Sequence, residues 1–327
     1  MLKLAAKLLD RPAPEGARRL AVLRLRALER ARPRLEDPAD AEALHDFRVA
    51  LRRLRSVLRA YRAVLGDTVS AKTRRLLARL ARETGACRDG EVRLAWLESR
   101  RGAIEGVDEA VFSWVEGHLV RAKGGHDRKL QRELKRNFRT LIAWLDRALT
   151  HYHVSLAPGA RRPVRRTRDL LAGAVIELTA SLREKLAVPT GVGDVRELHS
   201  ARIAAKKLRY VLEPVAEGGF APVRLARSSR AAVRQLCLLQ DELGLVNDSH
   251  EFGEWLRAHV ASTSSPAENP GTRIEGLERR LTADAEEGYA AATLPENRQR
   301  LERALAAVET AVRAMVTTPS TRASLRS

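Results

Sequence analysis

Five basic side chains follow one another at helical spacing near the start of the chain. His45, Arg48, Arg52, Arg55 and Arg59 are separated by three, four, three and four residues, which places them in one narrow stripe along an α-helix. Like charges one turn apart destabilise a helix by about 0.2–0.5 kcal/mol per pair, and this stripe contains no Asp or Glu. A row of cations without counter-charges is typical of a surface that binds an extended anion.

A second stripe of the same kind occurs in the other half of the chain. The segment LHDFRVALRRLRSVL at 44–58 aligns with LHSARIAAKKLRYVL at 198–212 without a gap. The residues of the second segment that match the first stripe and its neighbour Arg53 are His199, Arg202, Lys206, Lys207 and Arg209. A histidine at the head of both stripes indicates an additional hydrogen-bond donor to the same anion.

A further pair of segments indicates an internal duplication. TGACRDGEVRLAWL at 84–97 aligns with LGLVNDSHEFGEWL at 243–256, in the same order as the first pair and at nearly the same offset. Asp89 and Asp248 occupy matching positions, and each follows a glycine. This placement predicts that the two carboxylates lie in the first turn of a helix and stabilise it, in preference to a catalytic or metal-binding role. The two alignments together predict two related, pseudo-symmetric helical halves.

Basic residues also occur on the helix that follows each stripe. If that helix packs beside the stripe, its cations line the same groove. These cations are Lys72, Arg75 and Arg79 in the first half and Arg230 and Arg234 in the second. The segment HDRKLQRELKRNFR at 126–139 is equally basic, and the sequence leaves open whether it extends the groove or is an ordinary exposed face.

Almost every stretch between proline or glycine breaks has helical periodicity, and no run alternates as a strand would. The sequence therefore predicts an all-α fold, a helical bundle of two halves around a basic groove or pore. The predicted helices cover about 16–35, 40–65, 68–84, 89–102, 107–122 and 126–150, then 165–187, 194–217, 223–243, 247–261, 271–291 and 295–316. We expect one domain at 16–316, with halves at 16–155 and 163–316, between an N-terminal extension at 1–15 and a C-terminal tail at 317–327.

The balance of charges limits the partners that the chain can have. It contains 60 Lys and Arg against 41 Asp and Glu, a formal net charge of +19, and self-repulsion of that size favours an anionic partner. Hydrophobic residues make up 44%, enough for a core, whereas aromatic residues make up 4%, few for a protein that stacks bases. No apolar run is long enough to span a membrane, and no secretion signal is recognisable. We therefore expect a soluble cytoplasmic protein without a membrane partner, a metal or a cofactor.

The doubled pattern LHxxRVxxRRLRxxL, followed by the pairs R-D and N-D, resembles the family called the conserved histidine α-helical domain, CHAD. The resemblance covers about residues 16–316 and implies a bundle of long helices in two halves, with basic residues around a central groove or pore. It also implies binding of inorganic polyphosphate and association with polyphosphate granules. The ligand contacts that it implies by position are His45, Arg48, Arg52, Arg55, His199, Arg202, Lys206 and Arg209. One departure is the Lys206-Lys207 pair in place of two arginines, which keeps the charge but loses the bidentate fork.

Many relatives of this kind follow a triphosphate-tunnel catalytic domain with an ExExK strand. No such segment precedes residue 16, so the resemblance implies the stand-alone form, without catalysis. The leading hypothesis is therefore non-enzymatic binding of long polyphosphate chains, and of other polyanions, along the paired stripes. The oligomeric state is not predicted.

Two alternatives remain open. A nucleic-acid binder also fits a pI near 11.0 and clustered arginines, although no helix-turn-helix, RRM or zinc-finger pattern occurs. A phosphohydrolase or an enzyme with a phosphorylated histidine would use His45 or His199. The sequence has no acidic cluster for Mg²⁺, no P-loop and no HExxH motif that would support such an enzyme.

Overall fold

The computed structural model describes residues 8–317, except 38, 41, 67, 105–106, 108, 151–164, 218 and 262–273. All elements of secondary structure in the described residues are helical, so the predicted all-α fold is confirmed. The long helices are α2 (Ala13–Ala31), α3 (Ala43–Ala60), α5 (Ala71–Ser99), α6 (Glu109–Glu133), α7 (Arg139–Thr150), α8 (Thr167–Leu186), α9 (Val195–Glu217), α10 (Val223–Ala261), α11 (Glu275–Thr293) and α12 (Pro295–Thr317). The short elements are η1 (Leu8–Asp10), η2 (Pro33–Glu36), α4 (Arg62–Leu65) and the π-helical turn η3 (Leu134–Phe138).

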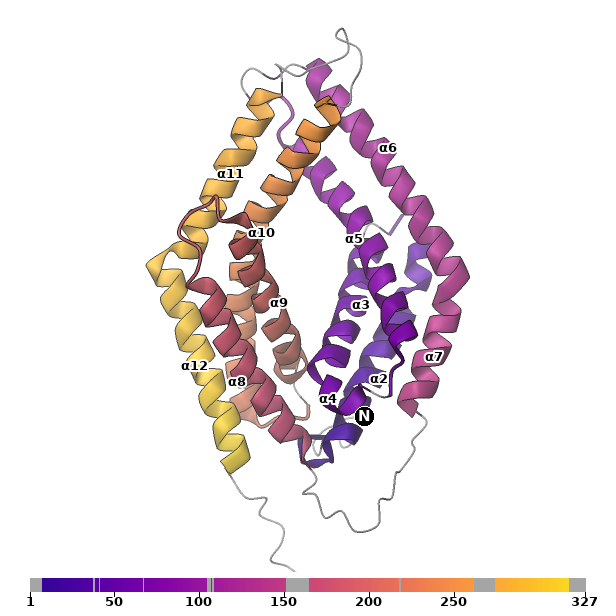
Figure 1. Ribbon diagram of the computed structural model, residues 1–327, viewed down its shortest axis with the longest axis vertical. Helices are drawn as coiled ribbons and strands as arrows, with labels where there is room; N and C mark the ends of the chain where they lie inside the picture. The colour runs from indigo at the N-terminus through magenta and orange to yellow at the C-terminus, as the bar shows by residue number, and fades with distance from the viewer. Residues whose placement is uncertain are drawn as a thin grey trace, which may run out of the picture.

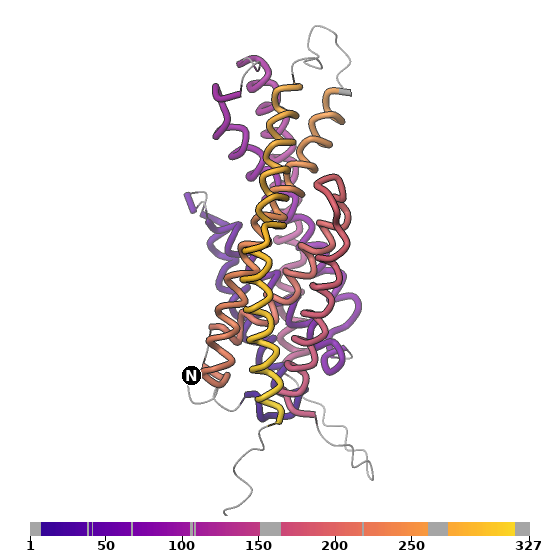
Figure 2. The backbone as a smooth tube through the Cα atoms, turned by 90° about the vertical axis from the view of Figure 1, so that its left-hand side faces the viewer, coloured from indigo at the N-terminus to yellow at the C-terminus, as the bar shows by residue number. Residues whose placement is uncertain are grey.

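The helices form two arms that enclose a central space (Figure 1). Helices α2 to α7 make one arm and α8 to α12 make the other, with α3 and α9 on the inner sides. The arms meet at one end through α2 and α8, and at the other through a hydrophobic cluster at the ends of α5, α6, α10 and α11. Figure 2 shows that the molecule is elongated along these helices. None of the helices in the described residues is long and apolar enough to cross a membrane.

The orientation of α3 follows from its apolar face. Phe47, Leu51, Leu54 and Leu58 recur every three or four residues and are buried. Burying each of these side chains contributes about 1.5–3 kcal/mol, which exceeds the few tenths of a kcal/mol that each like-charge pair on the neighbouring stripe costs. The apolar face therefore packs into the core, and the basic stripe is left beside it, toward the other arm.

The buried residues of the described chain form three clusters. One lies within each arm, and the third, around Phe112 and Phe252, joins α5, α6, α10 and α11 at the far end. Ion pairs tie the arms together at the near end. Arg24 Nη2 lies 3.0 Å from Glu217 Oε2, and Arg53 Nε lies 2.8 Å from Glu213 Oε2. The arms are thus fixed relative to each other at both ends of the central space.

Three predicted helix breaks are wrong. Helix α5 continues through Gly85, α6 through Gly124 and Gly125, and α10 through Gly244. A glycine within a helix costs about 1 kcal/mol relative to alanine. This cost is outweighed because α5 packs on both α3 and α6, and α10 packs on both α9 and α11.

The uninterrupted helices change the interpretation of two carboxylates. Asp89 lies inside α5 and Asp248 lies inside α10, each many residues from a helix start. The prediction that they stabilise the first turn of a helix is therefore wrong. The predicted helix at 126–150 is also divided, because the π-helical turn η3 separates the end of α6 from α7.

Candidate functional site

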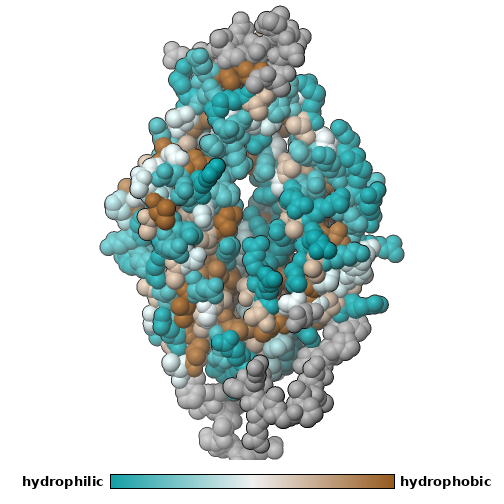
Figure 3. Space-filling view, viewed as in Figure 1, coloured by the Kyte–Doolittle hydropathy of each residue, from teal (hydrophilic) through white to brown (hydrophobic). Residues whose placement is uncertain are grey.

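The two stripe helices contact each other across the arms, and a cavity of about 620 Å³ opens beside them. Its walls come from α3 and α5 of one arm and from α9, α10 and one residue of α11 of the other. The predicted site residues that line it are His45, Arg48, Arg52, His199, Arg202 and Lys206. Figure 3 shows a hollow between the arms with hydrophilic side chains around it. The structure thus brings part of each stripe to one shared space.

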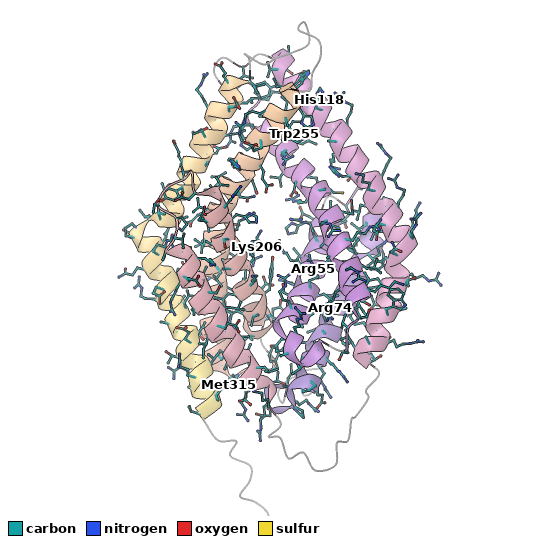
Figure 4. All side chains as sticks on the ribbon, in the orientation of Figure 1. Arg55, Arg74, His118, Lys206, Trp255 and Met315 are labelled. Atoms are coloured by element: carbon teal, nitrogen blue, oxygen red, sulfur yellow. The ribbon has the colours of Figure 1, made fainter. Side chains whose placement is uncertain are left out.

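A second cavity, of about 310 Å³, adjoins the first along α3. Arg48, Arg52 and Lys206 line both cavities, so the two spaces meet at these three cations. The cations that line only the second cavity are Arg55, Arg59 and Lys207. Figure 4 shows Arg55 and Lys206 on opposite sides of the space between the arms, on α3 and α9.

Crowding of cations in a partly buried space alters their protonation. Burial, and then the positive charges of Arg202 and Arg52, lower the pKa of Lys206 to about 7. Burial is also the main reason that the pKa values of Arg52 and Arg55 are lowered, although arginine stays charged. The carboxylate of Asp248 opposes this shift at Lys206 and that of Glu213 opposes it at Arg52, without restoring the ordinary pKa of either group. An anion that entered the cavities would further stabilise the charged forms.

Tyr210 is a buried residue at this site that no sequence pattern identified. It is 5% exposed, and the guanidinium carbons of Arg52 and Arg209 each lie 5.0 Å from its ring centroid. Arg209 Nη2 also donates to the Tyr210 hydroxyl over 3.2 Å. A cation close to an aromatic ring gains about 0.5–2 kcal/mol. Tyr210 of one arm therefore helps to hold Arg52 of the other in place.

The glycines that were predicted as helix breaks make room for two stripe arginines. A Cβ added at Gly85 would lie 3.4 Å from Arg48 Nη1, and one at Gly244 would lie 3.3 Å from Arg202 Nη2. Each guanidinium therefore lies close against the backbone of the neighbouring helix, where a side chain is absent. The same arrangement occurs at aligned positions in both arms.

Carboxylates accompany these arginines at one end of the larger cavity. Arg202 Nη2 lies 3.6 Å from Asp248 Oδ1. Burial raises the pKa of Asp89; the positive charge of Arg48 opposes this, whereas the carboxylates of Glu251 and Asp248 add to it. The cavity is thus cationic where the stripes meet and mixed in charge at the end formed by α5 and α10.

A hydrogen-bond chain orients His199 at this mixed end. Asn247 Nδ2 donates to Glu251 Oε1 over 3.0 Å, so the amide oxygen faces the other way, 2.5 Å from His199 Nδ1. His199 must therefore carry a proton on Nδ1 and donate it to Asn247. Nε2 is the remaining nitrogen, and it can donate to an anion only when the ring is a charged imidazolium.

Two predicted residues of the stripe segments, Arg53 and Arg209, pair with carboxylates instead of lining the cavities. Arg53 forms ion pairs with Glu213 at 2.8 Å and Glu217 at 3.7 Å. Arg209 Nε lies 3.3 Å from Glu213 Oε1. Neither arginine lines the cavities described above. The Arg53 guanidinium ties the two arms together, whereas Arg209 pairs with Glu213 four residues along the same helix, α9. The alignment of the stripes alone could not indicate either contact.

The residues predicted from the following helices also lie away from the two cavities. Helix α5 faces the cavities with Ala81 and Thr84, and farther along with Arg88. The predicted cations on the exposed face of α5 are Lys72, Arg75 and Arg79, and those on the exposed face of α10 are Arg230 and Arg234. The assumption that these helices turn their basic face toward the stripes therefore does not hold.

Gln240 is the least expected residue of the larger cavity. It is 4% exposed, and neither its amide nitrogen nor its oxygen has a hydrogen-bond partner in the described residues. The internal alignment gives no signal for it, because Ala81 stands at the matching position. A buried amide without partners costs about 1–3 kcal/mol. Water or a ligand in the cavity would satisfy it.

Among the described residues, no group of three or more His, Cys, Asp or Glu side chains could hold a metal ion. The fold and the cavities define an all-helical protein whose two arms bring cations to a shared space. The sequence pattern of the CHAD domain matches residues 19–257. The chain therefore belongs to the CHAD family.

Two solved structures are similar to this chain. The CHAD domain from the plant Ricinus communis superposes with a TM-score of 0.66 at 22% identity, over 91% of this chain and 93% of that one. PptA from Streptomyces chartreusis superposes with a TM-score of 0.56 at 15% identity, over 93% of this chain and 100% of that one. At these identities the likeness establishes the fold alone. No curated protein matches the chain.

Proposed function

We propose that the chain binds inorganic polyphosphate in the two adjoining cavities. The observation that carries this is the convergence of Arg48, Arg52 and Lys206, from both arms, where the cavities meet. Polyphosphate offers an unbroken row of charged acceptors, and hydrogen bonds to charged groups are roughly twice as strong as neutral ones. Membership of the CHAD family agrees with a phosphate-rich ligand.

The fixed positions of the cations favour tight binding. Tyr210 orients Arg52, and the glycines at 85 and 244 seat Arg48 and Arg202. A ligand then pays less to immobilise these side chains, each of which would otherwise cost about 0.5–1.5 kcal/mol. Lys206 is only partly protonated near neutral pH, because its pKa is about 7. Its contribution to binding therefore depends on pH.

Nucleic acid is the competing ligand, and the lining of the cavities disfavours it. Single strands bind by stacking bases on aromatic side chains. The guanidinium carbons of Arg52 and Arg209 lie over the Tyr210 ring, and that of Arg100 lies 5.5 Å from the Trp96 ring centroid. Few aromatic faces therefore remain for bases. Polyphosphate needs none.

The proposed role is binding without catalysis. The arginines and lysines can hold phosphates and neutralise them, and nothing in this role requires a bond to be made or broken. A protein of this kind would associate with polyphosphate granules in the cytoplasm, because a granule displays many copies of the same ligand.

Charge reversal tests the proposal. Arg52→Glu and Lys206→Glu should each weaken binding of long-chain polyphosphate by about tenfold to a hundredfold, since a hydrogen bond to a charged group contributes about 1.5–3 kcal/mol. Arg279→Glu is the matched control, because Arg279 lies on α11 with its side chain 70% exposed. Circular dichroism should remain unchanged in all three. Equal losses in the three variants would mean diffuse attraction, and would contradict a defined site.

A further inference from the structure

A third cavity, of about 340 Å³, lies on the outer side of α5, where α6 runs alongside it (Figure 1). It is formed within the basic segment 126–139 and the facing surface of α5. The residues that line it are Arg79, Glu83, Lys129, Arg132, Glu133 and Arg136. Neither of the two cavities between the arms includes any of these residues.

One of the two carboxylates in this cavity is already satisfied. Glu133 is 5% exposed and lies 2.9 Å from Arg79 Nη2, and it accepts a hydrogen bond from Asn137 over 2.8 Å. Glu133 thereby fixes Arg79 at the cavity wall. The remaining carboxylate is that of Glu83, and it is outnumbered by the cations of Lys129, Arg132 and Arg136. The cavity therefore has a clear excess of positive charge.

The three cations come from one helical face. Lys129, Arg132 and Arg136 are three and four residues apart, so they lie one above another along α6 and η3. All three are exposed. Arg136 belongs to the π-helical turn η3, a kind of turn that occurs often at functional sites. The row repeats, on the outside of the arm, the spacing of the stripe on α3.

A basic edge of α5 connects this cavity with the central ones. Ala81 and Thr84 face the central cavities and Arg79 faces the outer one. Arg82 lies about 100° around the helix from Ala81 and about 60° from Arg79, so it stands between the two faces. Arg82 is exposed and lies near enough to Arg55 to help lower the pKa of that guanidinium.

We propose that the outer cavity is a second phosphate-binding site, which holds the part of a long polyphosphate chain that emerges from the central cavities and crosses the Arg82 edge of α5. This inference rests on the proposed function and adds a chain-length preference to it. Short chains fill the central cavities only. Longer chains gain the contacts of Lys129, Arg132 and Arg136 as well.

The double variant Arg132→Glu, Arg136→Glu tests this inference. Each reversal removes an attractive charge at the surface and introduces a repulsive one, so binding of long-chain sodium polyphosphate should weaken by about tenfold. Binding of short oligophosphates should change by less than about threefold. The control is Arg279→Glu, Arg303→Glu on α11 and α12, which has the same net charge, and Arg132→Gln, Arg136→Gln serves if the reversed variant folds poorly.

Each outcome decides a separate question. Loss of affinity for long chains alone, relative to the control, supports the outer site. Equal losses for long and short chains, or a loss no larger than that of the control, would overturn it while the central site stands. If the wild-type chain binds neither length of polyphosphate, the proposed function itself fails, and the variants are not needed to reach that conclusion.

Discussion

Raising the pH should weaken polyphosphate binding, because Lys206 loses its proton near neutrality. In the free protein its pKa is about 7. A polyanion in the cavity offsets the repulsion from Arg202 and Arg52, and raises the bound pKa toward the ordinary value of 10.5. Between the free and the bound pKa, binding takes up a proton, so affinity falls about tenfold per pH unit. From about pH 6 to about pH 8.5 the expected loss is about thirtyfold, and below the free pKa the affinity is flat.

The lowered pKa of Lys206 also makes the stability of the free protein depend on pH, in the direction opposite to that of the binding affinity. Between about pH 7 and pH 10.5 the unfolded chain holds the Lys206 proton and the folded chain does not. The free energy of unfolding that Lys206 contributes therefore rises with pH across this window. A protein that becomes more stable while it binds polyphosphate less tightly would identify a buried cation as the cause of both effects.

Calorimetry in two buffers of different ionisation enthalpy measures the affinity and the proton uptake together. Lys206→Gln should remove the proton uptake assigned here, and Lys206→Arg should keep tight binding at the alkaline end, because arginine stays charged. The decisive quantity is the difference in proton uptake between the wild type and the two Lys206 variants. If Lys206→Gln takes up as many protons as the wild type, Lys206 is not the titrating group and the reasoning is refuted.

Three further predictions concern residues around the larger cavity. Gly244→Ala should leave the free energy of unfolding unchanged or raise it by about 1 kcal/mol. It should weaken polyphosphate binding several-fold, because the new Cβ would lie only 3.3 Å from the Arg202 guanidinium and would displace it. Unchanged affinity would show that the position of this guanidinium is irrelevant to binding. Gln240→Met should raise the unfolding free energy of the ligand-free protein by about 1 kcal/mol, since it removes a buried amide without partners; a destabilised variant in denaturant titration would mean that ordered water satisfies the amide. Asp248→Asn should tighten binding about threefold by releasing Arg202 from a carboxylate 3.6 Å away, and a weakened interaction in a binding titration would assign Asp248 a supporting role instead.

Helical periodicity and the duplicated stripe were sufficient to predict the helical fold and part of the candidate site. The apolar spacing of Phe47, Leu51 and Leu54 determines which face of α3 is buried, and this face can be read from the sequence alone. The paired histidines and arginines at the head of each stripe line one cavity, although the alignment left open whether the stripes face one pore or two surfaces. These features are local, so the sequence contains them directly.

The parts that were mispredicted depend on contacts between distant residues. A glycine in the sequence predicts a helix break unless the residue that packs against it is known. At Gly244 that residue is Arg202, on another helix. Arg53 reads as a ligand contact until Glu213 of the other arm is placed beside it. The duplication itself, and with it the relation between the two arms, stays a prediction from the alignments.

The most direct test of the central claim is a competition between long-chain polyphosphate and single-stranded DNA of matched charge, at physiological salt. The labelled DNA is bound first, and polyphosphate is then titrated into the complex. Because the cavities offer rows of cations and few free aromatic faces, polyphosphate should displace the DNA at well below equal charge, and Arg52→Glu should reduce this advantage. If DNA holds its place against an excess of polyphosphate, the chain is a nucleic-acid binder and the account given for its cavities is wrong.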